Sequence, residues 1–265
     1  MKLLHLALIK IAVTATILCL SSKVARSESY TYQAQAKDES GKVVYTEKAS
    51  VTAHQGHTQA IKTEYFSSDG KKVGEMNSKF KNHPYLSDFY FSDHRAPFFG
   101  GMKIDHSKKS AEIFSKGSTT AKFEKKSIDM QNEMMAFPGV QSFIADYVDQ
   151  VEKTKKTDKA TIRFVIPQRN DDYGFKVSVA DEKNLNSKTI KLKLEAQSFF
   201  IRLFAPKIEI EFDKTKKRIV SYKGPSIVSN DKGKCQNVQI TYQYKDVAEQ
   251  PNQLAKSKAD DPKML

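Results

Sequence analysis

The chain has 265 residues, of which 39% are hydrophobic and 28% charged, with 11 Gly, 8 Pro, 2 Cys and no Trp. This composition excludes collagen-like, disulfide-rich and mainly disordered chains, and the 16 Phe and 11 Tyr supply apolar surface for a sizeable core. The formal net charge of +13 raises the question of an acidic partner, such as nucleic acid or an anionic membrane.

Residues 1–27 read as a cleavable secretory signal peptide. The first ten residues contain two lysines, Lys2 and Lys10. An uncharged apolar run follows over residues 11–20. This run is about half the roughly 20 residues that a membrane-spanning helix needs. Ala25 and Ser27 place small side chains where cleavage before Glu28 requires them. We therefore expect export to the periplasm, with an extracellular location as the less favoured alternative.

Cleavage changes both the charge and the cysteine content. The leader carries four basic and no acidic residues, so the formal charge of +13 falls to +9. One of the two cysteines leaves with the leader, so Cys235 has no partner for an intramolecular disulfide. We expect Cys235 to be a buried, inert thiol, with pairing between two chains as the alternative.

Alternation of apolar and polar residues extends over most of the segment 30–244 and predicts antiparallel strands. The alternation is clearest over 173–179, 190–196, 208–213 and 238–244. Turn-forming clusters separate the strands, at 38–41, 67–70, 100–101, 213–216 and 230–233. Since these connections are short, successive strands are expected to pair with their neighbours.

His54 and His57 are the only closely spaced histidines of the mature chain. Zinc needs three or four converging ligands, and the remaining histidines are scattered. We interpret 54–57 as a solvated hairpin turn and expect no metal site.

The segment 83–95 holds the densest cluster of titratable and aromatic side chains. Alternation on a strand separates Asp93 from His94 but places Asp93 and Arg95 on one side. We favour a structural ion pair that fixes the next turn, and keep a ligand-binding Arg95 as the alternative.

One segment, 139–153, has the spacing of an amphipathic helix. Its apolar residues recur every three or four positions and its polar face mixes acidic and basic residues. We expect the helix to lie across the sheet and cap the core, rather than to bind a membrane or a partner. After a charged linker a strand follows, and Pro167 is expected to end it.

These elements predict a mainly β fold, with one large curved antiparallel sheet resembling a half-barrel and one central helix. The sheet belongs to a single domain over 28–245, and the polar segment 246–265 is expected to be disordered. Because one helix cannot cover so large a sheet, the concave face is expected to hold an incompletely filled apolar cavity.

The predicted function is therefore a non-enzymatic periplasmic protein that binds a lipid or other apolar ligand on the concave face. Its expected lining residues are aromatic, with two arginines for a polar headgroup: Phe143, Tyr147, Phe164, Phe175, Phe199 and Phe204, with Arg95 and Arg169. The alternative is a structural or envelope protein-interaction module without a small-molecule ligand.

No catalytic or cofactor-binding signature occurs in the sequence, so we expect neither enzymatic activity nor a cofactor. The lysine-rich stretches alternate with acidic or apolar residues, which is typical of solvated faces and not of nucleic-acid binding. An anionic membrane surface remains a plausible partner for a protein of charge +9, and we expect a monomer.

Three patches resemble an uncharacterised family of exported proteins in Gram-negative bacteria. They are Asp93-His94-Arg95, the segment 164–169 after the helix, and 222–226 followed by 231–234. The resemblance implies export, a β-rich fold and structural or motif roles for four residues: Asp93, Pro167, Gly224 and Ser226. Ala49 stands where that family has a histidine. The architecture is more loosely similar to periplasmic lipoprotein-carrier half-barrels, which hold acyl chains under helical lids.

Overall fold

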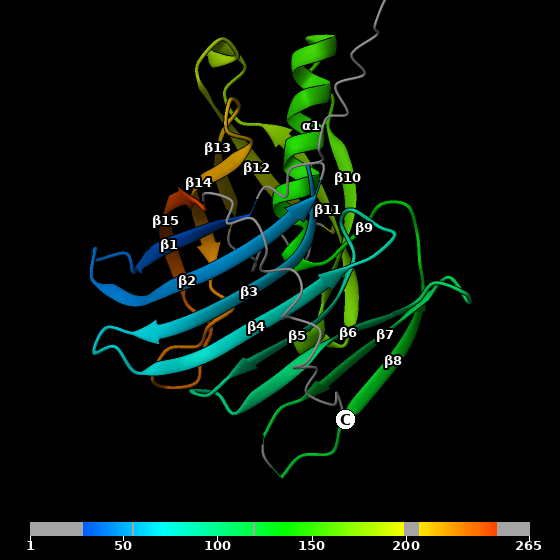
Figure 1. The fold of residues 1–265 in the computed structure, drawn as a ribbon, viewed down its shortest axis with the longest axis vertical. Helices are drawn as coiled ribbons and strands as arrows, with labels where there is room; N and C mark the ends of the chain where they lie inside the picture. The colour runs from blue at the N-terminus through cyan, green and yellow to red at the C-terminus, as the bar shows by residue number, and fades with distance from the viewer. Residues whose placement is uncertain (1–28, 55, 119, 199–206, 248–265) are drawn as a thin grey trace, which may run out of the picture.

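The computed structural model describes residues 29–247, except 55, 119 and 199–206. Within these residues fifteen strands form one sheet, in the spatial order β8-β7-β6-β5-β4-β3-β2-β1-β15-β14-β13-β12-β11-β10-β9 (Figure 1). Neighbouring strands are antiparallel, except that β9 and β10 are parallel. The expected mainly β fold with one large curved sheet and one α-helix is confirmed.

The strands and helices have the following bounds: β1 Tyr30–Lys37, β2 Val43–His54, β3 His57–Ser67, β4 Lys72–Phe80, β5 Ser87–Asp93, β6 Phe98–Asp105, β7 Ser110–Lys116, β8 Glu124–Asp129, β9 Met134–Met135, η1 Phe137–Gly139, α1 Val140–Thr154, β10 Ala160–Ile166, η2 Pro167–Arg169, β11 Asp171–Val179, η3 Glu182–Asn184, β12 Thr189–Ala196, β13 Ile208–Asp213, β14 Arg218–Pro225 and β15 Asn237–Asp246.

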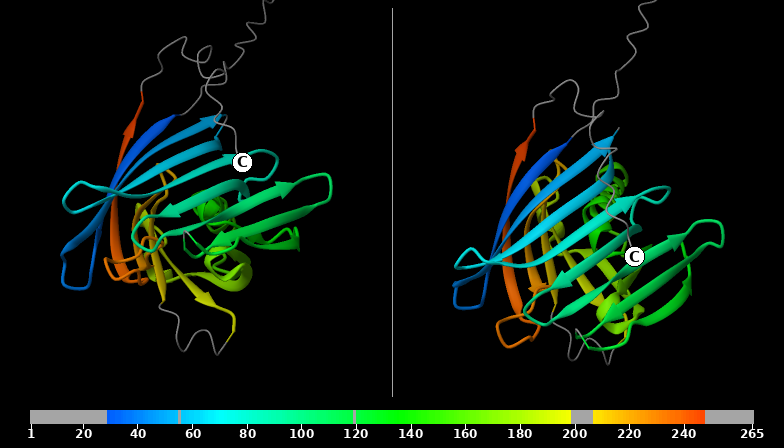
Figure 2. Two further views of the ribbon diagram at one scale, coloured as in Figure 1. Left: turned by 90° about the horizontal axis from the view of Figure 1, so that it is seen from below. Right: turned by 60° about the horizontal axis from the view of Figure 1, so that its bottom comes forward.

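The sheet curls until its two edges, β8 and β9, approach each other (Figure 2). The 3-10 helix η2 contacts β6 and β7 across this gap, and Lys126 of β8 forms a 2.8 Å ion pair with Asp171 of β11. A buried cluster there combines side chains of β5, β6 and β7 with those of β9 and β10. Side-chain packing, and not backbone pairing, thus closes the barrel-like wall.

Helix α1 covers the inner face of β10–β13 (Figure 1). Its apolar side, formed by Ile144, Tyr147, Val148 and Val151, is buried against these strands. The helix ends where Lys155 adopts the left-handed conformation (φ 57°) and its N–H bonds to Val151 O. The predicted helix is confirmed with a shift of one residue at each end.

The turns at 38–41, 54–57, 67–70, 213–216 and 230–233 all lie between paired strands, as expected. The loop predicted at 100–101 is wrong, because both glycines lie buried inside β6. A Cβ on Gly101 would lie 2.0 Å from Phe89 O and 2.9 Å from Phe114 Cζ, so these glycines permit close approach of the neighbouring strand and ring.

Two further expectations are wrong, and two others concern residues that the structure does not describe. Cys235 is exposed and not buried, since it lies in the loop between β14 and β15; its Sγ lies 3.3 Å from Ser226 O. Partial burial nevertheless raises the pKa of its thiol. Asp246, assigned to the tail, ends β15. The predicted signal peptide and residues 248–265 lie outside the described residues.

Over the part of the chain that the structure describes, no helix combines the length and the apolarity that crossing a bilayer requires.

Candidate functional site

Six tyrosines gather on the inner face of four adjacent strands, β15, β1, β2 and β3. We call this group the tyrosine cluster: Tyr30, Tyr32, Tyr45, Tyr65, Tyr242 and Tyr244. Ring centroids lie 5.5 Å apart for Tyr32–Tyr242, 5.6 Å for Tyr32–Tyr244 and 6.1 Å for Tyr45–Tyr65. The cluster forms because β1 and β15, the first and last strands that the structure describes, are neighbours in the sheet.

Glu47 lies inside the tyrosine cluster. On β2 its cross-strand neighbours are Ala34 of β1 and Tyr65 of β3. The residue is only 6% exposed, and within the described residues its carboxyl has no hydrogen bond or ion pair. Burial raises the pKa of Glu47 to about 8. The carboxyl is therefore mainly protonated at neutral pH, which avoids much of the cost of an uncompensated buried charge.

The other polar groups of the cluster are neutral hydroxyls. Burial raises the pKa of Tyr32, Tyr45, Tyr65 and Tyr242, and the proximity of Glu47 acts in the same direction. Thr63 on β3 is fully buried and its hydroxyl interacts with the Tyr32 hydroxyl. The region thus combines aromatic surface with a carboxyl that has no partner among the described residues.

Small residues and partial exposure distinguish this inner face from a filled core. Ala34 and Ala49 lie beside Glu47 and Tyr32, where larger side chains would occupy the space above the sheet. Tyr32, Tyr242 and Tyr244 stay partly exposed although they point inward. Solvent therefore reaches part of the inner face at the tyrosine cluster.

The N-terminal turn of α1 borders the cluster. Gln141 donates a 2.6 Å hydrogen bond from Nε2 to the Tyr30 hydroxyl, and its Oε1 lies 3.2 Å from the Tyr244 hydroxyl. Arg218 of β14 stacks its guanidinium 4.2 Å from the Tyr30 ring centroid and also pairs with Asp246. These contacts fix the edge of the cluster and link it to the helix.

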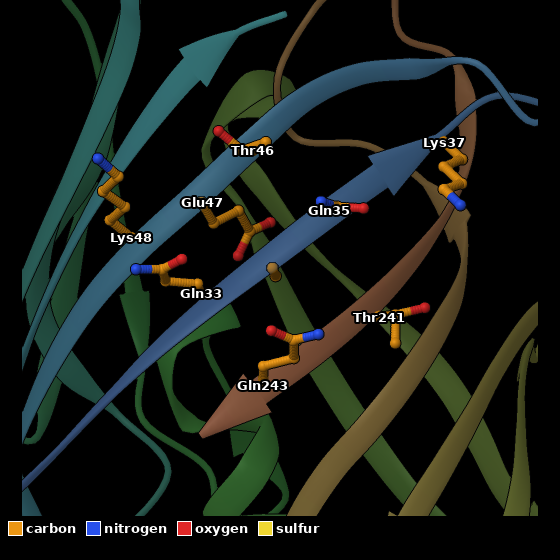
Figure 3. A pocket seen from close by; sticks show the side chains of 9 residues that line it. Gln33, Gln35, Lys37, Thr46, Glu47, Lys48, Thr241 and Gln243 are labelled. Atoms are coloured by element: carbon orange, nitrogen blue, oxygen red, sulfur yellow. The ribbon is translucent and has the colours of Figure 1, made fainter. Parts of the chain in front are cut away.

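On the outer face of the same strands is a hollow of about 250 Å³ (Figure 3). Its lining is mostly polar: Gln33, Gln35, Lys37, Thr46, Lys48, Thr241 and Gln243, with Ala34 and Glu47. A second hollow of about 250 Å³ lies on β6–β8 and is also largely polar. Neither hollow is lined by any of the aromatic residues predicted from the sequence to hold a ligand.

Asp93 and Arg95 form a structural connection, and their side chains pair with other groups instead of with each other. Asp93 is buried and accepts hydrogen bonds from the backbone N–H of Arg95 (2.9 Å) and of Ser229 (2.7 Å). Arg95 donates to Ser229 O (3.1 Å) and Val44 O (3.2 Å), and lies 3.4 Å from the Asp231 carboxylate. The predicted turn-fixing role is thus carried by backbone hydrogen bonds, and the Arg95 guanidinium is occupied by protein groups.

Two of the sequence patches meet here, because the loop between β14 and β15 folds over the end of the barrel. Ser226 is buried and its hydroxyl lies 3.2 Å from the Tyr45 hydroxyl and 2.7 Å from Val228 O. Gly224 leaves room for the Tyr222 hydroxyl, which would lie 2.8 Å from a Cβ at that position. Pro167 is buried and begins η2 directly after β10, as expected.

The predicted lining residues are placed apart from the tyrosine cluster. Tyr147 is a buried member of the helix-covered core, and three others pack against it: Phe143, Phe164 and Phe175. Arg169 is exposed on η2. Phe199 and Phe204 lie outside the described residues. A ligand-binding role for these residues stays a prediction.

Sequence reasoning missed Glu47 and the tyrosine cluster. A signal was present, since period two places Glu47 on the same face as Tyr45 and Ala49, an acid at an otherwise apolar position. The sequence pattern does not reveal that β1 pairs with β15, and this pairing brings Tyr242 and Tyr244 to this face. Among the described residues no group of three or more His, Cys, Asp or Glu is arranged to hold a metal ion.

Comparison with solved structures gives a loose likeness in fold. No protein-family model matches the chain, and no curated protein matches its sequence. The structure is loosely similar to a crystal structure from Brucella abortus, described as a β-barrel-like protein of a domain of unknown function, DUF1849. The match has a TM-score of 0.41 and 7% sequence identity, and covers 84% of this chain and 100% of the other. The chain is a mainly β protein with one large curved sheet and one α-helix, and it has a loose fold-level similarity to this protein of a Gram-negative bacterium.

Proposed function

We propose that this is a periplasmic, non-enzymatic protein that binds a lipid or other largely apolar molecule on the concave face of its sheet. The observation that supports it is the tyrosine cluster, whose inward-facing rings Tyr32, Tyr242 and Tyr244 remain partly exposed. A tyrosine presents an apolar ring and a polar tip, which suits a ligand with an apolar body and a polar end. The site is therefore centred on β15, β1, β2 and β3, and not on the helix-covered residues.

Adjacent residues of β2 offer a matched test. Ala49 points to the inner face and is 6% exposed, whereas Ser50 is exposed on the outer face. Ala49→Leu is expected to fill space beside Tyr32 and weaken binding of a fluorescent fatty acid about tenfold, while Ser50→Leu leaves it unchanged. Fluorescence titration measures both. Native mass spectrometry of protein purified from its own periplasm checks for a retained ligand; a bare polypeptide mass together with no probe uptake would refute the proposal.

A second candidate function, a protein-interaction module, is supported by an aromatic strip on the outer face near β8. Tyr90, Phe99 and Phe114 follow one another with centroid separations of 5.8 and 5.9 Å, and Phe123 lies 6.0 Å from Phe99. Phe123 is 52% exposed. Such a patch beside a sheet edge suits a protein partner. Crosslinking through a photoreactive residue at position 123 would identify a specific partner, and its absence would count against this candidate.

A further inference from the structure

We propose that Glu47 and the tyrosine cluster select a ligand that carries an organic ammonium group, held between the carboxylate and the tyrosine rings. The proposal rests on the proposed function and adds the chemistry of the polar end of the ligand. It starts from a group that the fold itself does not explain, a carboxyl that is 6% exposed and has no hydrogen bond or ion pair within the described residues.

A buried carboxyl without a partner lowers stability, so its presence needs a compensating role. Protein groups do not supply the missing counter-charge. Arg218, the basic residue that stacks on the cluster, lies over the rings of Tyr30 and Tyr244 and is paired with Asp246. Burial is the cause of the perturbed pKa of Glu47, with no opposing contribution from a basic side chain. A cation from outside the protein is the group that would complete this site.

The surroundings of Glu47 match an ammonium group better than an anion or an uncharged head. Tyrosine rings attract cations through their negative faces, and the attraction grows when the cation is removed from water. Tyr45 and Tyr65 flank Glu47 on β2 and β3, and Tyr32 and Tyr242 approach it from β1 and β15. An anionic head would instead meet a carboxyl. The apolar part of the ligand would lie along the remaining inner face.

Binding of a cation would be linked to the ionisation of Glu47. The titratable groups facing Glu47 are tyrosines: Tyr32 of β1, Tyr45 of β2, Tyr65 of β3, Tyr222 of β14, and Tyr242 and Tyr244 of β15. All have a pKa raised above the ordinary value and stay neutral below pH 10, and Gln141 of α1 is uncharged. The carboxyl has a pKa of about 8, so its ionised fraction rises about tenfold per pH unit well below that value.

Three probes with the same twelve-carbon chain test the selection, each used below its micelle concentration: dodecyltrimethylammonium, dodecyl sulfate and dodecyl maltoside. Isothermal titration calorimetry of the mature protein at pH 9 is expected to show that the ammonium probe binds at least about tenfold more tightly than the sulfate probe. Ammonium binding is expected to weaken by about tenfold or more from pH 8.5 to pH 6, and to release a proton at pH 7.

Glu47→Gln keeps the shape of the side chain and removes its charge. It is expected to reduce ammonium binding at pH 9 at least about tenfold, to abolish the pH dependence of that binding and to change maltoside binding much less than ammonium binding. Glu64→Gln is the matched control, because Glu64 lies on neighbouring β3 and pairs with Lys72 at the surface. The wild-type pH profile tests the same point without a variant.

The outcomes separate the two proposals. Equal binding of all three probes, or ammonium binding that is independent of pH and of Glu47→Gln, overturns the selection for ammonium and leaves the proposed function standing. Binding of none of the probes, together with no retained ligand in native mass spectrometry, overturns both.

Discussion

The inner face of the curved sheet has two regions, and they differ in how completely other parts of the protein cover them. In the helix-covered region, α1 seals the inner face of β10–β13, and Ile144, Val177 and Leu192 are completely buried. In the tyrosine region, β15, β1, β2 and β3 have no helix of their own over most of their inner face, and three inward tyrosines stay partly exposed. A 15-residue helix spans about 22 Å, which covers one region and only borders the other.

Under the proposed function, stability and binding depend on different parts of one sheet. The helix-covered region is apolar and closed, as expected for a structural core. The tyrosine region retains a buried acid, Glu47, which lowers stability and is typical of functional sites. Perturbing each region should therefore affect different properties of the protein.

The largest effect is expected from pH acting on Glu47. Its pKa is 4.5 in the unfolded chain and about 8 in the folded protein, so the folded state holds the proton more tightly. The contribution of Glu47 to the free energy of unfolding is thus greatest below pH 4.5 and is lost as the pH rises from about 4.5 to about 8, by up to about 5 kcal/mol. Urea unfolding of wild type and Glu47→Gln at pH 5.5 and 9 isolates this contribution. A constant difference between the two proteins would contradict it.

The same truncation in the two regions should have unequal costs. Ile144→Ala removes side-chain volume from a fully buried position of α1 and is expected to lower the free energy of unfolding by about 3 kcal/mol. Ile61→Ala, at a partly exposed position of β3, is expected to cost less than half as much. Chemical denaturation measures both, with Gln150→Ala on the exposed side of α1 as control. Equal costs would mean that the tyrosine region is as tightly packed as the other.

Removing the connection at the end of the barrel should have an intermediate effect. Asp93→Ala leaves the backbone N–H groups of Arg95 and Ser229 without their acceptor and is expected to cost about 2 kcal/mol. Asp93→Asn keeps one acceptor oxygen and should cost less. Denaturant midpoints of the two variants provide the comparison; if they coincide with wild type, the loop between β14 and β15 is held by other contacts.

The smallest effect is expected from a single hydroxyl of the cluster. Tyr244→Phe removes the 2.7 Å hydrogen bond from the Tyr244 hydroxyl to Ile219 O and should cost about 1 kcal/mol. Tyr242→Phe is the control, because the Tyr242 hydroxyl makes no hydrogen bond to the described residues. Thermal unfolding monitored by circular dichroism would compare the stabilities of the two variants. A larger loss of stability in Tyr242→Phe than in Tyr244→Phe would contradict the role given to the Tyr244 hydrogen bond.

Periodicity alone predicted much of the fold. Alternation identified β11, β12, β13 and β15, and the three- and four-residue spacing identified α1. Clusters that contain aspartate, most of them with glycine, marked most of the turns correctly. The glycine pair at 100–101 was wrongly predicted to form a loop. Glycine also occurs inside strands where the backbone passes close to a bulky ring, as Gly101 does beside Phe114. A local pattern does not distinguish these two uses.

The candidate site was less accessible to prediction. Aromatic residues near the helix were expected to line a cavity, yet Phe143, Phe164 and Phe175 pack against the core. The sequence identifies residues that prefer burial, and the same preference serves a packed core and a ligand site. Asp93 and Ser229 lie 136 positions apart, and their hydrogen bond is a property of the loop that crosses the barrel end.

The amino-acid sequence by itself determined the class of fold and the face on which each side chain lies, because strand and helix periods are local properties of the backbone. The tertiary structure decided which faces meet. Only the pairing of the first strand with the last brings Tyr32 and Tyr244 together, and only the curl of the sheet encloses Glu47 among them. Long-range pairing depends on the energy of the whole chain, so a buried carboxyl without a partner becomes visible only when the sheet is complete.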